Sequence, residues 1–306
     1  MSWMSHWSAQ RRNGILSLTG SHTINIVVAV LTLPIILTSL PIADYGKWQF
    51  MLALQAWAIT ISAPHITDGS KRGLALSQDG TFFFALFKRA RMMFLPSGLF
   101  LLLGAFFLWT DRTEFGLLSL VSAAYLFFNI LLQESIGDFL IAKQSFATHG
   151  IWSILISPVA RIGSSVVVFF TQSIVLFAFF QVVYAFVLTL TTLFVLIKRA
   201  QLWKQYRKRN YDASCFRFGI RALPVDILGA LSNRLVEILI GTVFGLSNLA
   251  YFSVARDLRN QIANLLKITF PLFYADFAKR PLETLTNVVK KQMVRMIAAS
   301  TLLGML

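Results

Sequence analysis

Residues 162–197 read IGSSVVVFFTQSIVLFAFFQVVYAFVLTLTTLFVLI and contain no charged side chain. A membrane-spanning helix needs about 20 apolar residues, because the hydrocarbon core of a bilayer is about 30 Å thick and a helix rises about 1.5 Å per residue. The run is too long for one span and long enough for two. The polar tripeptide Thr171-Gln172-Ser173 divides it, so we predict two helices joined by a tight turn.

The same kind of apolar run recurs along the whole chain. Of its 306 residues, 56% are hydrophobic and 13% are charged, and the mean hydropathy is +0.67. This composition excludes an ordinary soluble domain and a disordered chain. We predict an all-α, polytopic transmembrane helical bundle with eight complete spans. They lie at about 15–40, 48–69, 92–110, 116–137, 151–171, 174–197, 222–244 and 250–273.

A ninth helix is predicted to begin near Met293. It has only 11 uncharged residues, 296–306, before the sequence stops, which is too short to cross a bilayer. We therefore expect a truncated ninth span. The predicted organisation is an N-terminal six-helix lobe over 1–197, a basic cytoplasmic linker over 198–221, and an incomplete second lobe over 222–306.

The distribution of basic residues predicts the orientation in the membrane. The chain has 28 Lys and Arg against 13 Asp and Glu, a formal net charge of +15. With the N-terminus in the cytoplasm, 21 of the 28 fall in cytoplasmic segments, and only Lys47 and Arg112 fall in outer loops. Cytoplasmic loops carry such an excess of basic residues. Most of the charge is therefore a topology signal, and we expect no nucleic-acid partner.

The linker 198–221 alone holds eight basic residues. Two interpretations remain open for it. It binds anionic lipid head groups at a boundary between two lobes, or it is a solvated loop that follows the sixth span. The pattern restarts after the linker, because a shift of 205 residues places Gly14 on Gly219 and Leu18 on Leu223. Parallel repeats of this kind are a common plan among transporters.

Two passages resemble a known family. The first contains Thr19-Gly20, Leu33-Pro34 and the segment IADYGKW over 42–48. The second contains Leu223-Pro224, Gly241, Gly245 and the segment LAYFSVA over 249–255. Together they resemble the first helix, the Tyr-Gly turn and the start of the second lobe in the oligosaccharide flippase family of polysaccharide biosynthesis proteins. That family lies within the multidrug/oligosaccharidyl-lipid/polysaccharide exporter superfamily.

The resemblance implies a function, a substrate and a location. Such a chain moves an undecaprenyl-pyrophosphate-linked oligosaccharide across the bacterial inner membrane, by alternating access around a central cavity. It serves the biosynthesis of O-antigen, capsule or exopolysaccharide. The implied partners are the lipid-linked oligosaccharide with its pyrophosphate, membrane lipids, and also a glycan polymerase and glycosyltransferases.

Charged residues inside the predicted spans are the candidates for a functional site. Such a residue costs about 2.5 to 3.5 kcal/mol at the centre of a spanning helix, so it is expected to face a cavity or a partner. Arginine remains charged and binds phosphate oxygens bidentately. We predict substrate binding by Arg161, Arg234, Arg256 and Arg259, with charge balance or coupling by Asp226, Glu237, Asp68 and Glu134.

A structural interpretation of the same residues remains open. Arg234 has Glu237 one helical turn away, and Arg256 and Arg259 flank Asp257, so these groups can form ion pairs that only let helices pack. Asp68 lies three residues after His65. This pair either couples transport to protons, because histidine titrates near neutral pH, or anchors the end of a helix.

The sequence leaves several functions other than a flippase open. No arrangement typical of a catalytic, metal or cofactor site occurs: the four His are scattered, Cys215 is the one cysteine, and HExxH, GxSxG and the Walker A pattern are absent. We therefore expect no enzyme, no metal and no cofactor. The alternatives are a multidrug or cation antiporter of the same superfamily, a membrane glycan polymerase or ligase, and a non-transporting scaffold of a glycan assembly complex.

Overall fold

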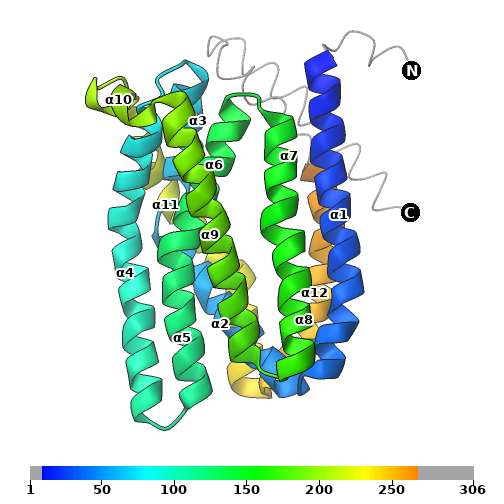
Figure 1. Ribbon diagram of the computed structural model, residues 1–306. Coiled ribbons are helices and arrows are strands. Elements are labelled where there is room, and N and C mark those ends of the chain that lie inside the picture. Colours follow the sequence, from blue (N-terminus) through cyan, green and yellow to red (C-terminus); the bar gives the residue numbers. More distant parts are fainter. Residues whose placement is uncertain (1–8, 268–306) are drawn as a thin grey trace.

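The computed structural model describes residues 9–267, and every regular element within them is a helix. Figure 1 shows the long helices side by side as an upright bundle, with α1 at one edge and α4 at the other. The all-α prediction is confirmed. The α-helices are α1 (Ala9–Ser39), α2 (Ile42–Ile61), α3 (His65–Ala75), α4 (Thr81–Trp109), α5 (Thr113–Ala124), α6 (Leu131–Ala142), α7 (Phe146–Ile154), α8 (Ala160–Thr171), α9 (Ile174–Ala200), α10 (Leu202–Arg207), α11 (Ser214–Leu239) and α12 (Leu246–Lys267).

Short π-helical segments join several of these helices into longer rods. Tyr125–Ile130 connects α5 to α6, Leu155–Val159 connects α7 to α8, and Ile240–Phe244 extends α11. Pro158 lies in the second of them and has no amide hydrogen to donate, which favours a local change of the hydrogen-bond ladder. Each predicted span therefore corresponds to one rod or to one pair of consecutive helices.

By length and composition, five described helices or rods can cross a membrane, and up to seven if two bent pairs each count as one span. The bent pairs are α2 with α3, at 55°, and the two halves of the 214–244 rod, at 43°. The eighth predicted span, α12, is absent from this set. It is the helix that carries Arg256, Asp257 and Arg259. The ninth helix near Met293 lies outside the described residues.

The turn predicted within 171–173 is confirmed. Helix α8 ends at Thr171, Gln172 takes a left-handed conformation with φ of 51°, and α9 begins at Ile174. The Ser173 hydroxyl accepts a hydrogen bond from the Leu176 amide at 3.4 Å and so caps α9. The polar tripeptide closes the hairpin because it supplies both the turn and the cap.

The second predicted span is not one helix. Residues 48–69 were expected to be continuous, but α2 ends at Ile61 and α3 begins at His65. Ala63 has a φ of 53° and Pro64 follows it. A positive φ cannot continue a right-handed helix, and proline disfavours a helical residue before it. The break turns α3 away from α2 and carries the polar side chains of His65 and Asp68 with it.

Three predicted helix starts are wrong for a common reason. The helices expected from 92, 151 and 222 begin at Thr81, Phe146 and Ser214. Each extension carries polar or basic residues that interrupt the apolar run without interrupting the helix. In α4, for example, Lys88 and Arg91 are good helix formers, and Arg89 is fully buried, at 0% exposure.

Helices α2 and α12 meet backbone to backbone at one end of the bundle. Gly46 lies directly against the carbonyl group of Leu246, where a Cβ atom would have no room. Beside it, Tyr45 and Trp48 are buried, and Trp48 packs edge-on against Phe177 at 5.9 Å. The Tyr-Gly motif of the sequence therefore forms a close helix contact, which needs a residue without a side chain.

Candidate functional site

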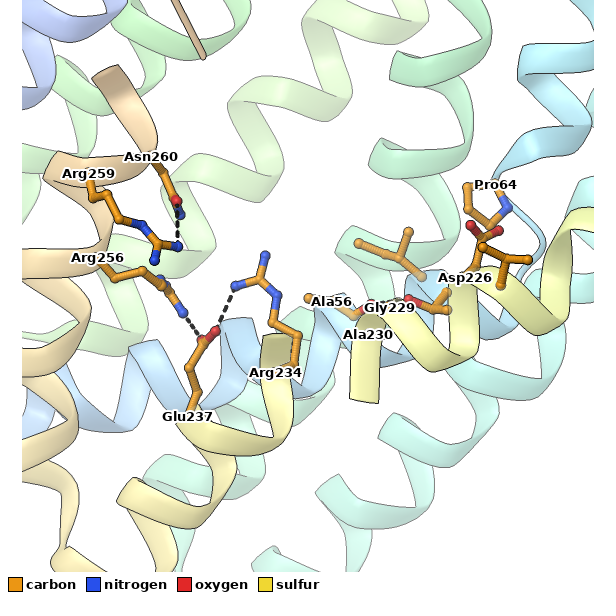
Figure 2. A pocket seen from close by; sticks show the side chains of 13 residues that line it. Ala56, Pro64, Asp226, Gly229, Ala230, Arg234, Glu237, Arg256, Arg259 and Asn260 are labelled. Carbon is orange, nitrogen blue, oxygen red and sulfur yellow. Dashed lines mark hydrogen bonds and ion pairs between the residues drawn. The ribbon is translucent and has the colours of Figure 1, made fainter. Parts of the chain in front are cut away.

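A cavity of about 890 Å³, called the large cavity below, lies between α2, α11 and α12. Five of the eight residues that the sequence singled out line it (Figure 2). The small residues Gly229 and Ala230 on α11 also line it, and their size leaves room between the helices. The five are Asp226, Arg234, Glu237, Arg256 and Arg259.

Glu237 holds two arginines at once. Its Oε1 accepts a hydrogen bond from Arg234 Nη1 at 2.9 Å, and its Oε2 pairs with Arg256 Nη1. Figure 2 shows the carboxylate between the two guanidinium groups. Only 1% of Glu237 is exposed. Arg234 lies three residues earlier on the same helix, where side chains share a face, whereas Arg256 comes from α12. The carboxylate thus joins α11 to α12.

The cavity carries more positive than negative charge. Arg259 hydrogen-bonds to Asn260 at 3.3 Å, and no carboxylate within residues 9–267 pairs with it. Oδ1 of the second acidic residue, Asp226, lies 2.9 Å from Nε2 of His65 on α3. The Asp226 carboxylate therefore interacts with this histidine as well as lining the cavity. Arg256 also hydrogen-bonds to Asp257 at 3.1 Å, one of the ion pairs that the sequence left open. The three guanidinium groups therefore meet Glu237, which is fully committed, and Asp257, which pairs with one of them, whereas Asp226 is engaged by His65. Anions are attracted into such a site, and a low local dielectric strengthens the attraction.

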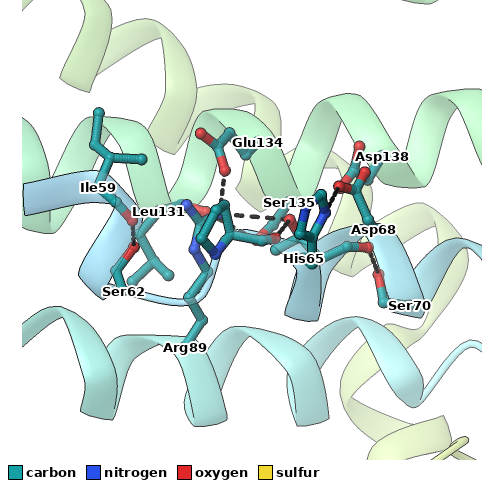
Figure 3. A network of polar contacts seen from close by, with 12 residues as sticks. Ile59, Ser62, His65, Asp68, Ser70, Arg89, Leu131, Glu134, Ser135 and Asp138 are labelled. Carbon is teal, nitrogen blue, oxygen red and sulfur yellow. Dashed lines mark hydrogen bonds and ion pairs between the residues drawn. The ribbon is translucent and has the colours of Figure 1, made fainter. Parts of the chain in front are cut away.

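A second cavity of about 420 Å³ lies between α3, α6 and α7. It is lined by Asp68 and Glu134, two further residues that the sequence singled out, and by Asp138. Lys71 bridges Asp68 at 2.5 Å and Asp138 at 2.9 Å. Arg89 of α4 pairs with Glu134, as Figure 3 shows. Each of the three acidic residues of this second cavity thus pairs with one of two cations, Lys71 of α3 or Arg89 of α4.

Arg161 lies apart from the three arginines of the large cavity. It lines a smaller chamber of about 120 Å³ together with Tyr45 and Asp257. Helix α8, which carries Arg161, packs against α1 and α9, and no described residue of α11 lines this chamber. In the same chamber Gln49 donates a hydrogen bond to the Tyr45 hydroxyl at 2.8 Å.

Sequence reasoning missed two central cations. Arg89 was counted as a charge of a cytoplasmic loop, although it lies inside a helix and is buried against Glu134. Lys71 was counted in the same way, although it bridges two carboxylates. The available signal was the spacing of Glu134 and Asp138, four residues apart on one helix face, which demands cationic partners at membrane depth. The Asp68–His65 pair was identified, but not its link to Asp226.

No described group of three or more His, Cys, Asp or Glu side chains has the arrangement of a metal site. The chemistry of the large cavity is instead that of reversible ion pairing. Guanidinium groups from two helices converge on a carboxylate, and a phosphate group offers oxygen atoms of similar geometry.

Comparison with known proteins agrees with the fold and with the predicted family. Residues 146–273 match the family model described as polysaccharide biosynthesis protein. The sequence has no significant match among the curated proteins. The chain is similar in structure to a multidrug resistance transporter of the MATE family and the MOP superfamily, in its outward-facing conformation, with a TM-score of 0.58 and 15% identity. The match covers 90% of this chain and 68% of that one.

At 15% identity, the structural similarity supports the fold alone. The match to the family model supports a relation in sequence over residues 146–273. Several apolar helices on this fold make the chain a multi-pass membrane protein. Residues 146–273 thus carry the signature of polysaccharide biosynthesis proteins, in agreement with the resemblance predicted from the sequence, and the chain has the fold of the MATE transporter that it resembles.

Proposed function

We propose that this chain is a flippase that moves a lipid-linked oligosaccharide, joined to its undecaprenyl carrier by a pyrophosphate, across the bacterial inner membrane. In this proposal the N-terminus is cytoplasmic and the product feeds a surface polysaccharide such as O-antigen, capsule or exopolysaccharide. The chain comprises a first lobe of six spans, up to residue 197, and the beginning of a second lobe after the linker. The large cavity lies where helices of the two lobes meet.

The observation that carries the proposal is the pairing of Glu237 with Arg234 and Arg256. A buried carboxylate between two guanidinium groups occupies the position that a phosphate group of the substrate would take. Each pyrophosphate oxygen can replace a carboxylate oxygen in the same hydrogen bonds. Glu237 then keeps the arginines in place while the cavity is empty, and Arg259, with no acidic partner among the described residues, adds attraction for the second phosphate.

Exchange of this kind supports alternating access. The substrate gains little from two arginines that are already neutralised, unless Glu237 turns away or takes up a proton. Loading of the cavity therefore changes the contact between α11 and α12, because Glu237 is the residue that joins them. A ligand can shift a conformational equilibrium only through such a difference in contacts between the two states.

The experiment replaces each cavity arginine by Ala and by Lys in cells that depend on this protein for a surface glycan. Loss of glycan at normal protein level for Ala, with partial recovery for Lys, is expected at Arg234, Arg256 and Arg259. Arg112→Ala is the matched control, because Arg112 is exposed in the turn between α4 and α5. Normal glycan in all three Ala variants would show that the arginines only pair within the protein.

A transport assay separates this function from its alternatives. Proteoliposomes that contain the protein are expected to move a fluorescent lipid-pyrophosphate saccharide, and not an organic cation, between leaflets. Movement of the cation alone would assign the chain to the antiporters. Failure to move either compound, at normal folding, would favour a scaffold or an enzyme of glycan assembly.

A further inference from the structure

The linker after α9 contains a short helix, α10 (Leu202–Arg207), which lies at the end of the bundle where α9 ends and α4 begins (Figure 1). Gln201 takes a left-handed conformation and turns the chain out of α9. Leu202 is then completely buried, in a cluster with Leu74 and Phe82. Helix α10 is therefore attached to the bundle through an apolar anchor at its first residue.

Hydrogen bonds hold the rest of the linker to the α3–α4 turn. The Gly80 amide donates to the carbonyl of Asn210 at 3.0 Å, and Asn210 Nδ2 donates to the carbonyl of Ser77 at 3.2 Å. The Asp212 amide donates to the Thr81 hydroxyl at 2.8 Å. These contacts join residues more than 100 positions apart in the sequence. The linker thus has a defined structure held by these hydrogen bonds, whereas a solvated loop requires none of them.

The change from exposed apolar to exposed basic residues along α4 and along α9 indicates the level of the membrane surface. In α4, closely spaced exposed apolar side chains begin with Phe94, just after Lys88 and Arg91, and Phe87 is the one described exposed apolar side chain that precedes them. In α9, they end with Phe194 and Val195, just before Lys198 and Arg199. Apolar exposed residues face acyl chains and the basic residues next to them reach the head groups. Helix α10 follows Arg199 by three residues, so it lies at the level of the lipid head groups.

An aromatic cluster faces outward at this level. Trp203 packs against Phe83 with ring centroids 5.2 Å apart and against Phe87 at 6.3 Å. Trp203 and Phe87 remain 41% and 40% exposed, and the guanidinium of Arg207 lies 5.6 Å from the Trp203 ring. Trp and Tyr are enriched at the membrane interface, because their rings are largely apolar and carry one polar group, and Trp203 is such a residue.

The charge around this cluster has one sign. The segment 198–209 contains six basic residues and no acidic one. All six are exposed, and no ion pair links any of them to a carboxylate in the part of the chain that the structure describes. They are Lys198, Arg199, Lys204, Arg207, Lys208 and Arg209.

We propose that α10, with Trp203, Phe87 and these six basic residues, is a binding surface for anionic phospholipids, which we call the α10 surface. Trp203 and Phe87 enter the head-group layer, and the basic side chains bind the phosphate groups of lipids such as phosphatidylglycerol. The attraction between basic side chains and an anionic membrane decays over about one Debye length from the membrane surface. Helix α10 must therefore be held close to the surface, as its contacts with the bundle allow. This surface is separate from the large cavity, and it does not depend on the proposed substrate.

The test uses the quenching of tryptophan fluorescence by brominated lipids, with the full chain in nanodiscs. One set contains brominated phosphatidylglycerol, and the other contains brominated phosphatidylcholine at the same mole fraction. The Trp203 signal is the difference between the wild type and Trp203→Phe. Quenching of this signal is expected to be at least twofold stronger with the anionic lipid, and the excess is expected to disappear in 0.5 M salt.

The chain supplies a matched control at the far end of α4, the helix that contributes Phe87 to the α10 surface. Trp109 ends α4 and is 85% exposed, with no comparable basic cluster around it. Its signal, obtained with Trp109→Phe, is expected to be quenched equally by both lipids. The variant with Gln at Lys204, Arg207, Lys208 and Arg209 is expected to lose the excess quenching at Trp203 and to keep the signal at Trp109.

Two results would overturn the proposal. Equal quenching of Trp203 by both lipids would show that α10 lies in the interface without selecting anionic lipid. Absence of quenching by either lipid would place α10 outside the membrane. Both results come from the wild type and Trp203→Phe alone, so they do not depend on whether the fourfold variant folds.

Discussion

Nε2 of His65 lies 2.9 Å from a carboxylate oxygen of Asp226, a residue 161 positions later in the chain. The other ring nitrogen, Nδ1, lies 2.6 Å from Asp68. The imidazole therefore stands between two carboxylates and joins α3, before the basic linker, to α11, after it. Asp226 lines the large cavity and Asp68 lines the second one, so this histidine connects the two polar regions of the protein.

Removal of either partner is expected to weaken the contact between α3 and α11. His65→Ala and Asp226→Asn should each cost about 1 kcal/mol of stability, because a hydrogen bond to a charged group is lost in a half-buried position where solvent screens part of it. Thermal unfolding in detergent measures the loss. In the double variant the loss should be smaller than the sum of the two single losses. Strict additivity would mean that the two side chains do not interact.

The ion pair between Arg89, which is buried, and Glu134, which is 36% exposed, makes a second prediction. Arg89 is fully buried, and its Nε and Nη2 atoms have no hydrogen-bond partner among the described residues. Glu134→Ala would leave this cation uncompensated and is expected to cost about 3 kcal/mol. The paired replacement Arg89→Met with Glu134→Leu is expected to recover most of the loss. The measurement is the yield and the unfolding temperature of each variant. An equally unstable double variant would contradict this account.

Gly46 is predicted to tolerate no side chain. A Cβ atom there would collide with the carbonyl group of Leu246, so Gly46→Ala is expected to cost about 1 to 3 kcal/mol through overpacking. Gly98→Ala is the matched control, since a Cβ at Gly98 meets no atom within 4 Å and alanine favours a helix. The two variants should therefore move the unfolding temperature in opposite directions. A stable Gly46→Ala protein would show that α2 and α12 separate easily.

Glu237 yields a test of the cavity that is independent of transport. Glu237→Gln removes the negative charge between Arg234 and Arg256, so repulsion between the two guanidinium groups should lower the unfolding temperature. Inorganic pyrophosphate at millimolar concentration is expected to restore it, because a ligand that binds the folded state stabilises it. The wild type should respond less, since Glu237 already occupies the site. An identical response of both proteins to pyrophosphate and to sulfate would mean that the anion acts nonspecifically.

Much of the fold follows from the sequence alone. The length of each apolar run predicts a spanning helix, and Thr171-Gln172-Ser173 predicts the turn that closes the hairpin of α8 and α9. Helix starts were less predictable. The apolar runs stop at charged residues such as Lys88 and Arg91, whereas the helix continues through them, because helix formation depends on backbone hydrogen bonds and not on hydropathy.

The charged residues of the candidate site could be predicted from the sequence, but most of the ion pairs between them could not. The sequence itself identified the five charged residues that line the large cavity, because the cost of a charge in a bilayer applies to every residue within a predicted span. Spacing along one helix even identified Arg234 and Glu237 as neighbours. The tertiary structure decided that Arg256 joins them, that Arg161 does not, and that Arg89 and Lys71 leave the loops for the interior. These contacts join residues far apart in the chain, and only helix packing determines which of them meet.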